Sequence, residues 1–288
     1  MLSLMLIRFI KFPKTMLKEL RNPVMGTFYP TFGMVTWLVS AYFYPHAPRL
    51  CSALWLGAAI YHYSIAIYYT IIRIKERDFS NVMPTCFIIY TGMITGSVAS
   101  VGMGGIIPSI AHFMSMFGFT FYTILLPVVL YIVLKSEILD DKKLPTVGIV
   151  CSPAPLGIVG ILAIESHPNM YMLIWLIVTG LILLGVVYGY IIKLFKDGFK
   201  PSYVVFTFPL AIATLAAYKL STFFISTGHV FGVLGNVEIF IATYVVFFIL
   251  LNFINMFIKA INPKVGKFIE DEEKILGKAI YNNEVNEI

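Results

Sequence analysis

The chain has 288 residues, of which 59% are hydrophobic and 12% are charged, and its formal net charge is +6. Soluble domains average about 25% charged residues, so this composition excludes an ordinary soluble protein and indicates a polytopic membrane protein. The positive charge does not indicate a nucleic-acid partner, because the basic residues lie at the ends of the apolar runs and form no patch.

Apolar runs of about the 20 residues that a membrane-spanning helix needs recur along the whole chain. They predict an all-α membrane bundle of eight transmembrane helices over residues 24–259, with a basic lead at 1–23 and a charged tail at 260–288. The acidic stretch in the tail predicts a short solvated helix over 269–288. The runs cover residues 24–45, 49–73, 84–101, 108–134, 146–165, 169–194, 202–222 and 237–259.

The positions of lysine and arginine predict the orientation of the bundle. All of the 21 basic residues except Arg49 and Lys219 fall in one of three places. These are the lead, every second connection between the apolar runs, and the part of the chain from the end of the last run onward. Cytoplasmic loops carry such an excess, so we expect both termini in the cytoplasm and the first, third, fifth and seventh spans running outward. The lead lacks the long apolar core and the small-residue cleavage site of a signal peptide.

The outward-running spans share a proline pattern. Pro30, Pro153 and Pro209 each follow another proline by seven or eight residues, which places them about 12 Å further along a helix that rises 1.5 Å per residue. Such a proline kinks the helix and frees a carbonyl, which is tolerated at membrane depth only beside protein or water. We therefore expect an inner set of kinked helices around a conduit. Ordinary membrane packing is the alternative, because proline is common in such helices.

Small residues favour the same division into inner and outer helices. Gly92 and Gly96 in the third span, and Gly157, Gly160 and Ala163 in the fifth, allow close approach of neighbouring helices. The inward-running spans carry more bulky aromatic side chains. They are expected to face the lipid.

The Phe208-Pro209 step is the candidate gate. A kink at Pro209 would turn the ring of Phe208 out of the regular helix surface, where it could plug a narrow passage. A core aromatic packed on a neighbour is the other interpretation. Phe206 and Ser152 are further candidates for the pore. Lys219, about 15 Å beyond Pro209, either draws anions to an outer vestibule or extends to the membrane interface.

Three segments resemble the tellurite-resistance/dicarboxylate-transporter family, which includes the plant slow-anion channels. "YVVFTFPLAIATLAAY" (203–218) is similar to the ninth helix of the family, "PTVGIVCSPAPLGIVGILA" (145–163) to the seventh and "NPVMGTFYPTFGMVTWLVSAYF" (22–43) to the third. The resemblance covers about residues 20–260. It implies five helical hairpins around a pore that one phenylalanine occludes, with the gate at Phe208 and the kink at Pro209.

On this register the eight runs correspond to the third to tenth helices of the family, so the first hairpin is absent. Residues 1–23 are then expected to be the end of the second helix and its loop, and the wall of the pore would be leaky or dependent on a partner. The resemblance also implies a homo-trimer in a plasma membrane, namely a prokaryotic inner membrane, with chloride, nitrate, sulfite or a C4-dicarboxylate such as malate as the solute.

The sequence contains no motif for a metal site, a cofactor, a disulfide or a proton relay. The histidines form no metal-binding pair and the cysteines lack CxxC spacing, so we expect no metal site, no cofactor and no disulfide. His62 and His112 are expected to be hydrogen-bonded packing residues, whereas Glu165 and Glu238 are expected to face solvent at helix ends. A proton relay is disfavoured because no chain of carboxylates is visible within the spans. The cysteines are Cys51, Cys86 and Cys151.

The sequence therefore predicts a passive channel or facilitative carrier for small anions, and not an enzyme. Its conduit would be lined by apolar and small side chains, without the deep carboxylate ring that attracts cations. The basic cytoplasmic rim would raise the local concentration of anions. Two alternatives stay open, namely a truncated scaffold or receptor that transports nothing, and an intramembrane enzyme, for which no nucleophile–base pair is visible.

Overall fold

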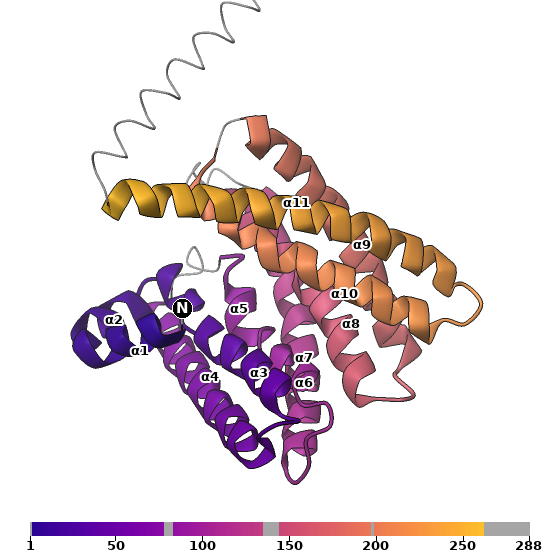
Figure 1. Cartoon of the computed structure of the whole chain (residues 1–288), viewed down its shortest axis with the longest axis horizontal. Coiled ribbons are helices and arrows are strands. Elements are labelled where there is room, and N and C mark those ends of the chain that lie inside the picture. Colours follow the sequence, from indigo (N-terminus) through magenta and orange to yellow (C-terminus); the bar gives the residue numbers. More distant parts are fainter. Residues whose placement is uncertain (1, 78–82, 135–143, 197–198, 262–288) are drawn as a thin grey trace, which may run out of the picture.

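The computed structural model describes residues 2–77, 83–134, 144–196 and 199–261, and within these ranges every regular element is a helix. The predicted tail helix at 269–288 lies outside the described residues. The all-α architecture expected from the sequence is thus confirmed (Figure 1).

The second, fourth, sixth and eighth of the expected spans are continuous helices. Their bounds match the expected runs closely, except that the last helix begins nine residues before the predicted start at residue 237. Together with the segment Pro201–Phe223, these are the helices of the described chain that are long and apolar enough to cross a membrane. They are α4 (Pro48–Glu76), α7 (Ile107–Leu134), α9 (Met170–Lys196) and α11 (Gly228–Ile261).

The first, third, fifth and seventh of the expected spans, in contrast, are all interrupted. Each consists of a short helical segment followed by a second helix, and in three of them the first segment is a 3₁₀-helix. The pairs are η1 (Met25–Phe28) with α3 (Thr31–Phe43), α5 (Cys86–Tyr90) with α6 (Ile94–Val98), η3 (Leu144–Cys151) with α8 (Pro153–Ile164), and η4 (Pro201–Phe206) with α10 (Thr207–Phe223).

Proline explains three of the four interruptions. Pro30 precedes the first residue of α3, Pro153 is the first residue of α8, and Pro209 is the third residue of α10. A proline lacks the N–H that would continue the preceding helix, and it fits best in a first helical turn. The interruption between α5 and α6 has no proline. It centres on Gly92, where an added Cβ would lie 2.1 Å from the carbonyl oxygen of Ile88.

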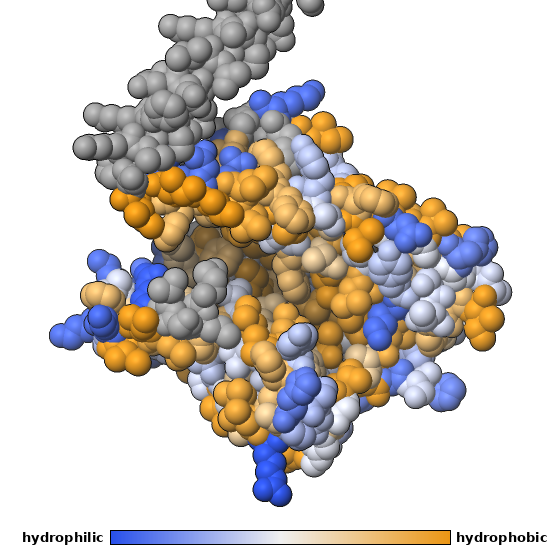
Figure 2. All heavy atoms as spheres, viewed as in Figure 1, coloured by the Kyte–Doolittle hydropathy of each residue, from blue (hydrophilic) through white to orange (hydrophobic). Residues whose placement is uncertain are grey.

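The second halves of the interrupted spans pack in a row. In this row α3 contacts α6, α6 contacts α8, and α8 contacts α10, while α4 packs on α3 and α11 packs on α10 (Figure 1). The residues Pro153–Ile161 of α8 are all buried, so α8 lies at the centre of the bundle. The ends of the row, α3 and α10, do not pack together to a comparable extent. Figure 2 shows a hollow with apolar walls between the α11 side and the α1–α4 side of the molecule.

Glycines bring the central helices together. The side chain of Ile94 on α6 is 1% exposed and lies between Gly118 of α7 and Gly160 of α8. A Cβ added at Gly160 would be 2.3 Å from Cγ2 of Ile94, and a Cβ added at Gly118 would be 2.4 Å from Cγ1 of the same residue. Only glycine at both positions permits this approach, as the small-residue pattern of the fifth span predicts for Gly160.

The basic lead folds against the first interrupted span. It forms α1 (Leu2–Lys11) and α2 (Pro13–Leu20). The Arg8 guanidinium donates to Glu19 at 2.6 Å, and the Tyr29 hydroxyl donates to the other oxygen of the same carboxylate at 2.5 Å. The ring of Phe9 packs against those of Tyr29 and Phe32. The lead is therefore attached to η1 and α3 by both polar and aromatic contacts.

Candidate functional site

The interruptions of these four spans lie next to one another in the bundle. On one side of the interruptions η1 contacts α5, α5 contacts η3, and η3 contacts η4. On the other side the second halves form the row already described. The three predicted kink prolines, Pro30, Pro153 and Pro209, are all buried at these boundaries between 3₁₀ and α geometry. The candidate site is thus built from the middle of four spans.

Each interruption carries a hydroxyl that bonds back to the preceding segment. The hydroxyls lie within two residues of the boundary and donate to a carbonyl three or four positions earlier, which satisfies an acceptor of the broken ladder. They are Thr31 to Phe28 at 2.6 Å, Thr91 to Phe87 at 2.6 Å, Ser152 to Ile149 at 2.8 Å and Thr207 to Val204 at 2.7 Å.

Ser152, a candidate pore residue, is therefore engaged within its own span. It is 7% exposed and precedes the first residue of α8. Its hydroxyl donates to the carbonyl of Ile149, which lies four residues before Pro153. In a regular helix the N–H of residue 153 would donate to this carbonyl, but proline has no N–H.

The two candidate phenylalanines occupy different environments. Phe206 is 3% exposed and packs edge-on against Tyr203. Its ring also fills the space above Gly148 of η3, where an added Cβ would meet it at 2.4 Å. Phe206 therefore joins η4 to η3 as a packing residue.

Phe208 lies at the junction of the two main apolar clusters of the molecule. One cluster gathers residues of the C-terminal helices such as Leu210, and the other gathers residues of α3 and α4 such as Trp37 and Trp55. Of the described residues, Ile88 and Phe208 pack against both clusters while remaining partly exposed. Phe208 thus reaches from α10 towards the other half of the bundle.

Lys219 is exposed and shares a face of α10 with Phe208. Residues three or four positions apart lie on the same face of a helix. One such stripe on α10 consists of Phe208, Ala211, Leu215 and Lys219. The last three are exposed, and the opposite faces of α10 pack on α8 and α11. The stripe therefore borders the side of α10 that no neighbouring helix of the described chain covers extensively.

The interrupted spans carry positive charge and no negative charge. Residues 24–43, 84–101, 144–164 and 201–223 contain a single charged side chain, that of Lys219. In addition, α3, α8 and α10 begin inside their spans, and the N-terminal end of a helix carries a partial positive charge. No carboxylate of these spans offsets that field.

The expectation for Glu238, a carboxylate in the interior of a membrane helix, was wrong. Glu238 was expected at a helix end facing solvent, but it is 5% exposed and lies in the interior of α11, because the helix already begins at Gly228. Its Oε2 accepts a hydrogen bond from the hydroxyl of Tyr188 on α9. Glu165, in contrast, ends α8 and lies 3.3 Å from Nδ1 of the exposed His112.

His62 behaves as the expected packing residue, whereas the exposed His112 does not. His62 is fully buried, its Nε2 lies 2.9 Å from the carbonyl oxygen of Ile89, and its ring stacks on Trp37. This confirms His62 as a hydrogen-bonded packing residue. The three cysteines are free and buried, and the described residues hold no group of three or more potential metal ligands.

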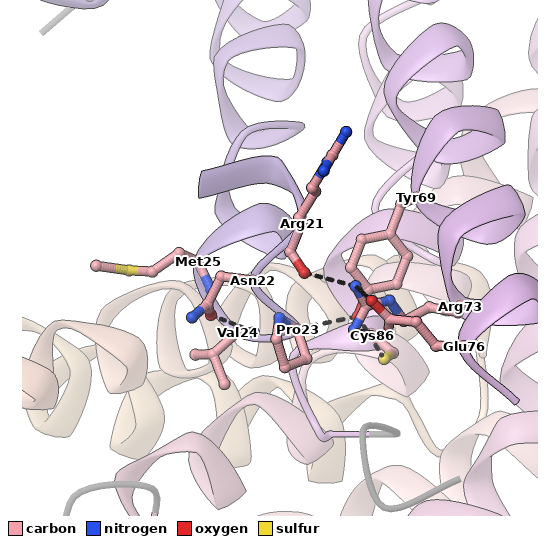
Figure 3. Close-up of polar contacts among 9 residues, drawn as sticks. All are labelled: Arg21, Asn22, Pro23, Val24, Met25, Tyr69, Arg73, Glu76 and Cys86. Carbon is pink, nitrogen blue, oxygen red and sulfur yellow. Dashed lines mark hydrogen bonds and ion pairs between the residues drawn. The ribbon is translucent and has the colours of Figure 1, made fainter. Parts of the chain in front are cut away.

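A network around Arg73 holds the start of the first interrupted span (Figure 3). The Arg73 guanidinium donates to the carbonyl oxygen of Arg21 at 2.5 Å and pairs with Glu76 at 2.9 Å. The hydroxyl of Tyr69 donates to the carbonyl of Pro23 at 3.0 Å. The carbonyls that end the lead are thereby fixed to α4.

Comparison with known proteins agrees with this architecture. The sequence model of the voltage-dependent anion channel family matches residues 1–257. The chain is also 26% identical over 178 residues to an uncharacterized transporter of Methanocaldococcus jannaschii, in an alignment that covers 58% of this chain and 52% of the relative. It thus spans about half the length of that relative. The family match covers both halves of the bundle and confirms the resemblance found in the sequence, so the chain belongs to the voltage-dependent anion channel family.

Proposed function

We propose that this protein is a channel or facilitative transporter for small anions, and that the solute passes along the stripe of α10 formed by Phe208, Ala211, Leu215 and Lys219. The observation that carries the proposal is the charge of the interrupted spans, whose single charged side chain is a lysine on that stripe. Membership of a family described as anion channels supports it.

The polar groups at the interruptions favour anions over cations. A cation would need oxygen acceptors, such as the carbonyl rings of cation-selective filters. Here the hydroxyls of Thr91, Ser152 and Thr207 already donate to carbonyls next to the breaks. The positive ends of α3, α8 and α10 supply the remaining field, as half-helices do in transporters that bind anionic groups. The proposed selectivity therefore depends on this field and on the ease with which the anion loses water.

Phe208 is the proposed gate. Its ring is partly exposed, begins the stripe, and packs against residues of both halves of the bundle. Rotation of the ring would open or close the passage at this end of the stripe. Lys219, near the other end of the stripe, is the proposed attractor for anions in an outer vestibule.

The surroundings of the protein belong to the same proposal. We propose a multi-pass protein of the plasma membrane, the inner membrane of a prokaryote, with both termini in the cytoplasm, as the distribution of basic residues predicts. The row from α3 to α10 is open at its ends, so lipid or a further subunit would complete the wall, and a homo-trimer is the proposed assembly. Chloride, nitrate, sulfite and C4-dicarboxylates such as malate are the proposed solutes.

The test is anion flux through the purified chain in liposomes. The variant Phe208→Ala removes the ring and is expected to increase the flux of chloride or nitrate several-fold. Phe240→Ala is the matched control, since Phe240 is 78% exposed on α11 and is expected to leave flux unchanged. Flux that stays equal or falls in a folded Phe208→Ala protein would contradict the gate. No flux of any proposed anion in the parent and both variants would favour the scaffold alternative.

A further inference from the structure

A cavity lies between the end of η3 and the helices α8, α9, α10 and α11. Its volume is about 160 Å³. The walls are largely apolar, with small residues such as Gly180, Ala213 and Ala217 providing the space. At its rim Leu181 and Val237 are 50% and 54% exposed. Because these rim side chains face the surroundings of a membrane helix bundle, the cavity is accessible to molecules dissolved in the bilayer.

Glu238 is the one acidic residue in the wall of this cavity. Its side chain is more than nine-tenths buried, and while Oε2 accepts from Tyr188, Oε1 is buried and has no partner within the described part of the chain. None of the side chains that line the cavity is basic. A buried carboxylate that lacks a counter-charge and has one oxygen without a donor costs several kcal/mol, so the open Oε1 indicates a missing partner.

The lining restricts the chemistry of that partner. A Mg²⁺ or Ca²⁺ ion takes about six or more oxygen ligands, whereas only Glu238 and Tyr188 contribute side-chain oxygen to this wall. A sugar or a peptide would leave several polar groups unsatisfied against the apolar walls. The fit is a molecule with one strong hydrogen-bond donor and an apolar body. Apolar cavities of about 150 Å³ take up benzene, which gives the size of that body.

We propose that this cavity binds a lipid-soluble amine in its ammonium form. The nitrogen donates to the open Oε1 of Glu238 and neutralises the carboxylate, and the apolar body, of about the size of a benzene ring, lies against α8 and α10. Tyr188 holds the carboxylate in place through its bond to the other oxygen. The site is separate from the stripe of α10, because Phe208 and Lys219 do not line it.

The experiment uses the purified full chain in lipid nanodiscs and benzylamine as the probe. Calorimetric titration is expected to show saturable binding of benzylamine. Glu238→Gln keeps the shape of the side chain and its bond with Tyr188 but removes the charge, so binding is expected to weaken at least about tenfold, which equals about 1.4 kcal/mol. Toluene, which has the same ring without the nitrogen, is expected to bind the parent and this variant equally.

Two further variants keep the proposal falsifiable. Ala217→Leu leaves the carboxylate intact but fills part of the cavity, and it is expected to weaken benzylamine and toluene alike. Glu165→Gln changes a carboxylate outside the cavity and is the matched control with unchanged binding. The proposal is overturned if benzylamine does not bind the folded parent saturably, or if it binds Glu238→Gln as tightly as the parent. If Glu238→Gln does not fold, the proposal is overturned when Ala217→Leu binds benzylamine as tightly as the parent does.

Discussion

Replacing Gly160 with alanine tests whether the centre of the bundle is as tightly packed as the structure shows. The added Cβ would lie 2.3 Å from Cγ2 of Ile94, and Ile94 has no room to retreat because its Cγ1 is already 2.4 Å from the position of a Cβ on Gly118. Overpacking of this kind costs about 1–3 kcal/mol. Alanine is favoured over glycine within a helix by about 1 kcal/mol, so the expected net loss is up to about 2 kcal/mol.

The assay is unfolding of the purified protein in detergent, followed by circular dichroism. Gly185→Ala on α9 is the matched control, because no atom lies within 4 Å of its added Cβ, and it is expected to be neutral or slightly stabilising. In an Ile94→Ala background, where the clashing side chain is gone, Gly160→Ala should cost less than in the parent, with a coupling energy of about 0.5–3 kcal/mol. Equal stability of Gly160→Ala and Gly185→Ala, or strictly additive effects in the double variant, would refute the packing.

Two further substitutions test polar contacts of the scaffold. Trp55→Phe removes the indole N–H that donates to the buried carbonyl of Gly96 at 3.1 Å, and should lower the free energy of unfolding by about 1–3 kcal/mol. Trp175→Phe, on the exposed face of α9, is the control and should change the free energy of unfolding little. Arg73→Gln removes the donor to the carbonyl of Arg21 and should speed amide hydrogen exchange at residues 21–26 several-fold. Lys75→Gln, at an exposed position of the same helix, is the control. Equal exchange in the two variants would contradict the role of the network.

The interruptions show what a sequence pattern can predict in such a protein. Pro30, Pro153 and Pro209 mark local breaks, because the missing N–H and the fixed φ act within one turn whatever the surroundings are. The interruption at Gly92 could not be placed in this way. Its only local signal is the pair Gly92 and Gly96, which favours close packing as much as a break. The neighbours decide between the two, and the close approach of Met34, 3.0 Å from an added Cβ, is a tertiary contact.

Glu238 illustrates the opposite case, in which a real signal was misread. A single acidic residue stands in an otherwise apolar stretch of α11, and an ionisable residue in a membrane helix is a functional candidate. The predicted span began at residue 237 because the preceding segment contains glycines, a histidine and an asparagine. The helix nevertheless extends back to Gly228, where the connection from α10 ends. Its start is set by that tertiary connection, which hydropathy does not record.

The proposed conduit needs a positive field, whereas the proposed amine cavity needs a negative charge, and the two lie on neighbouring faces of α10. The stripe of α10 carries a lysine, and its span holds no acid, so a carboxylate beside it would lower the positive field on which anion passage depends. Glu238 lies on α11, on the other side of α10, with its side chain turned into the cavity and bonded to Tyr188. A proton or an ammonium ion on this carboxylate removes its charge. Occupancy of the cavity therefore strengthens the positive field along α10, and the two proposed sites would be coupled through charge without any movement of the helices.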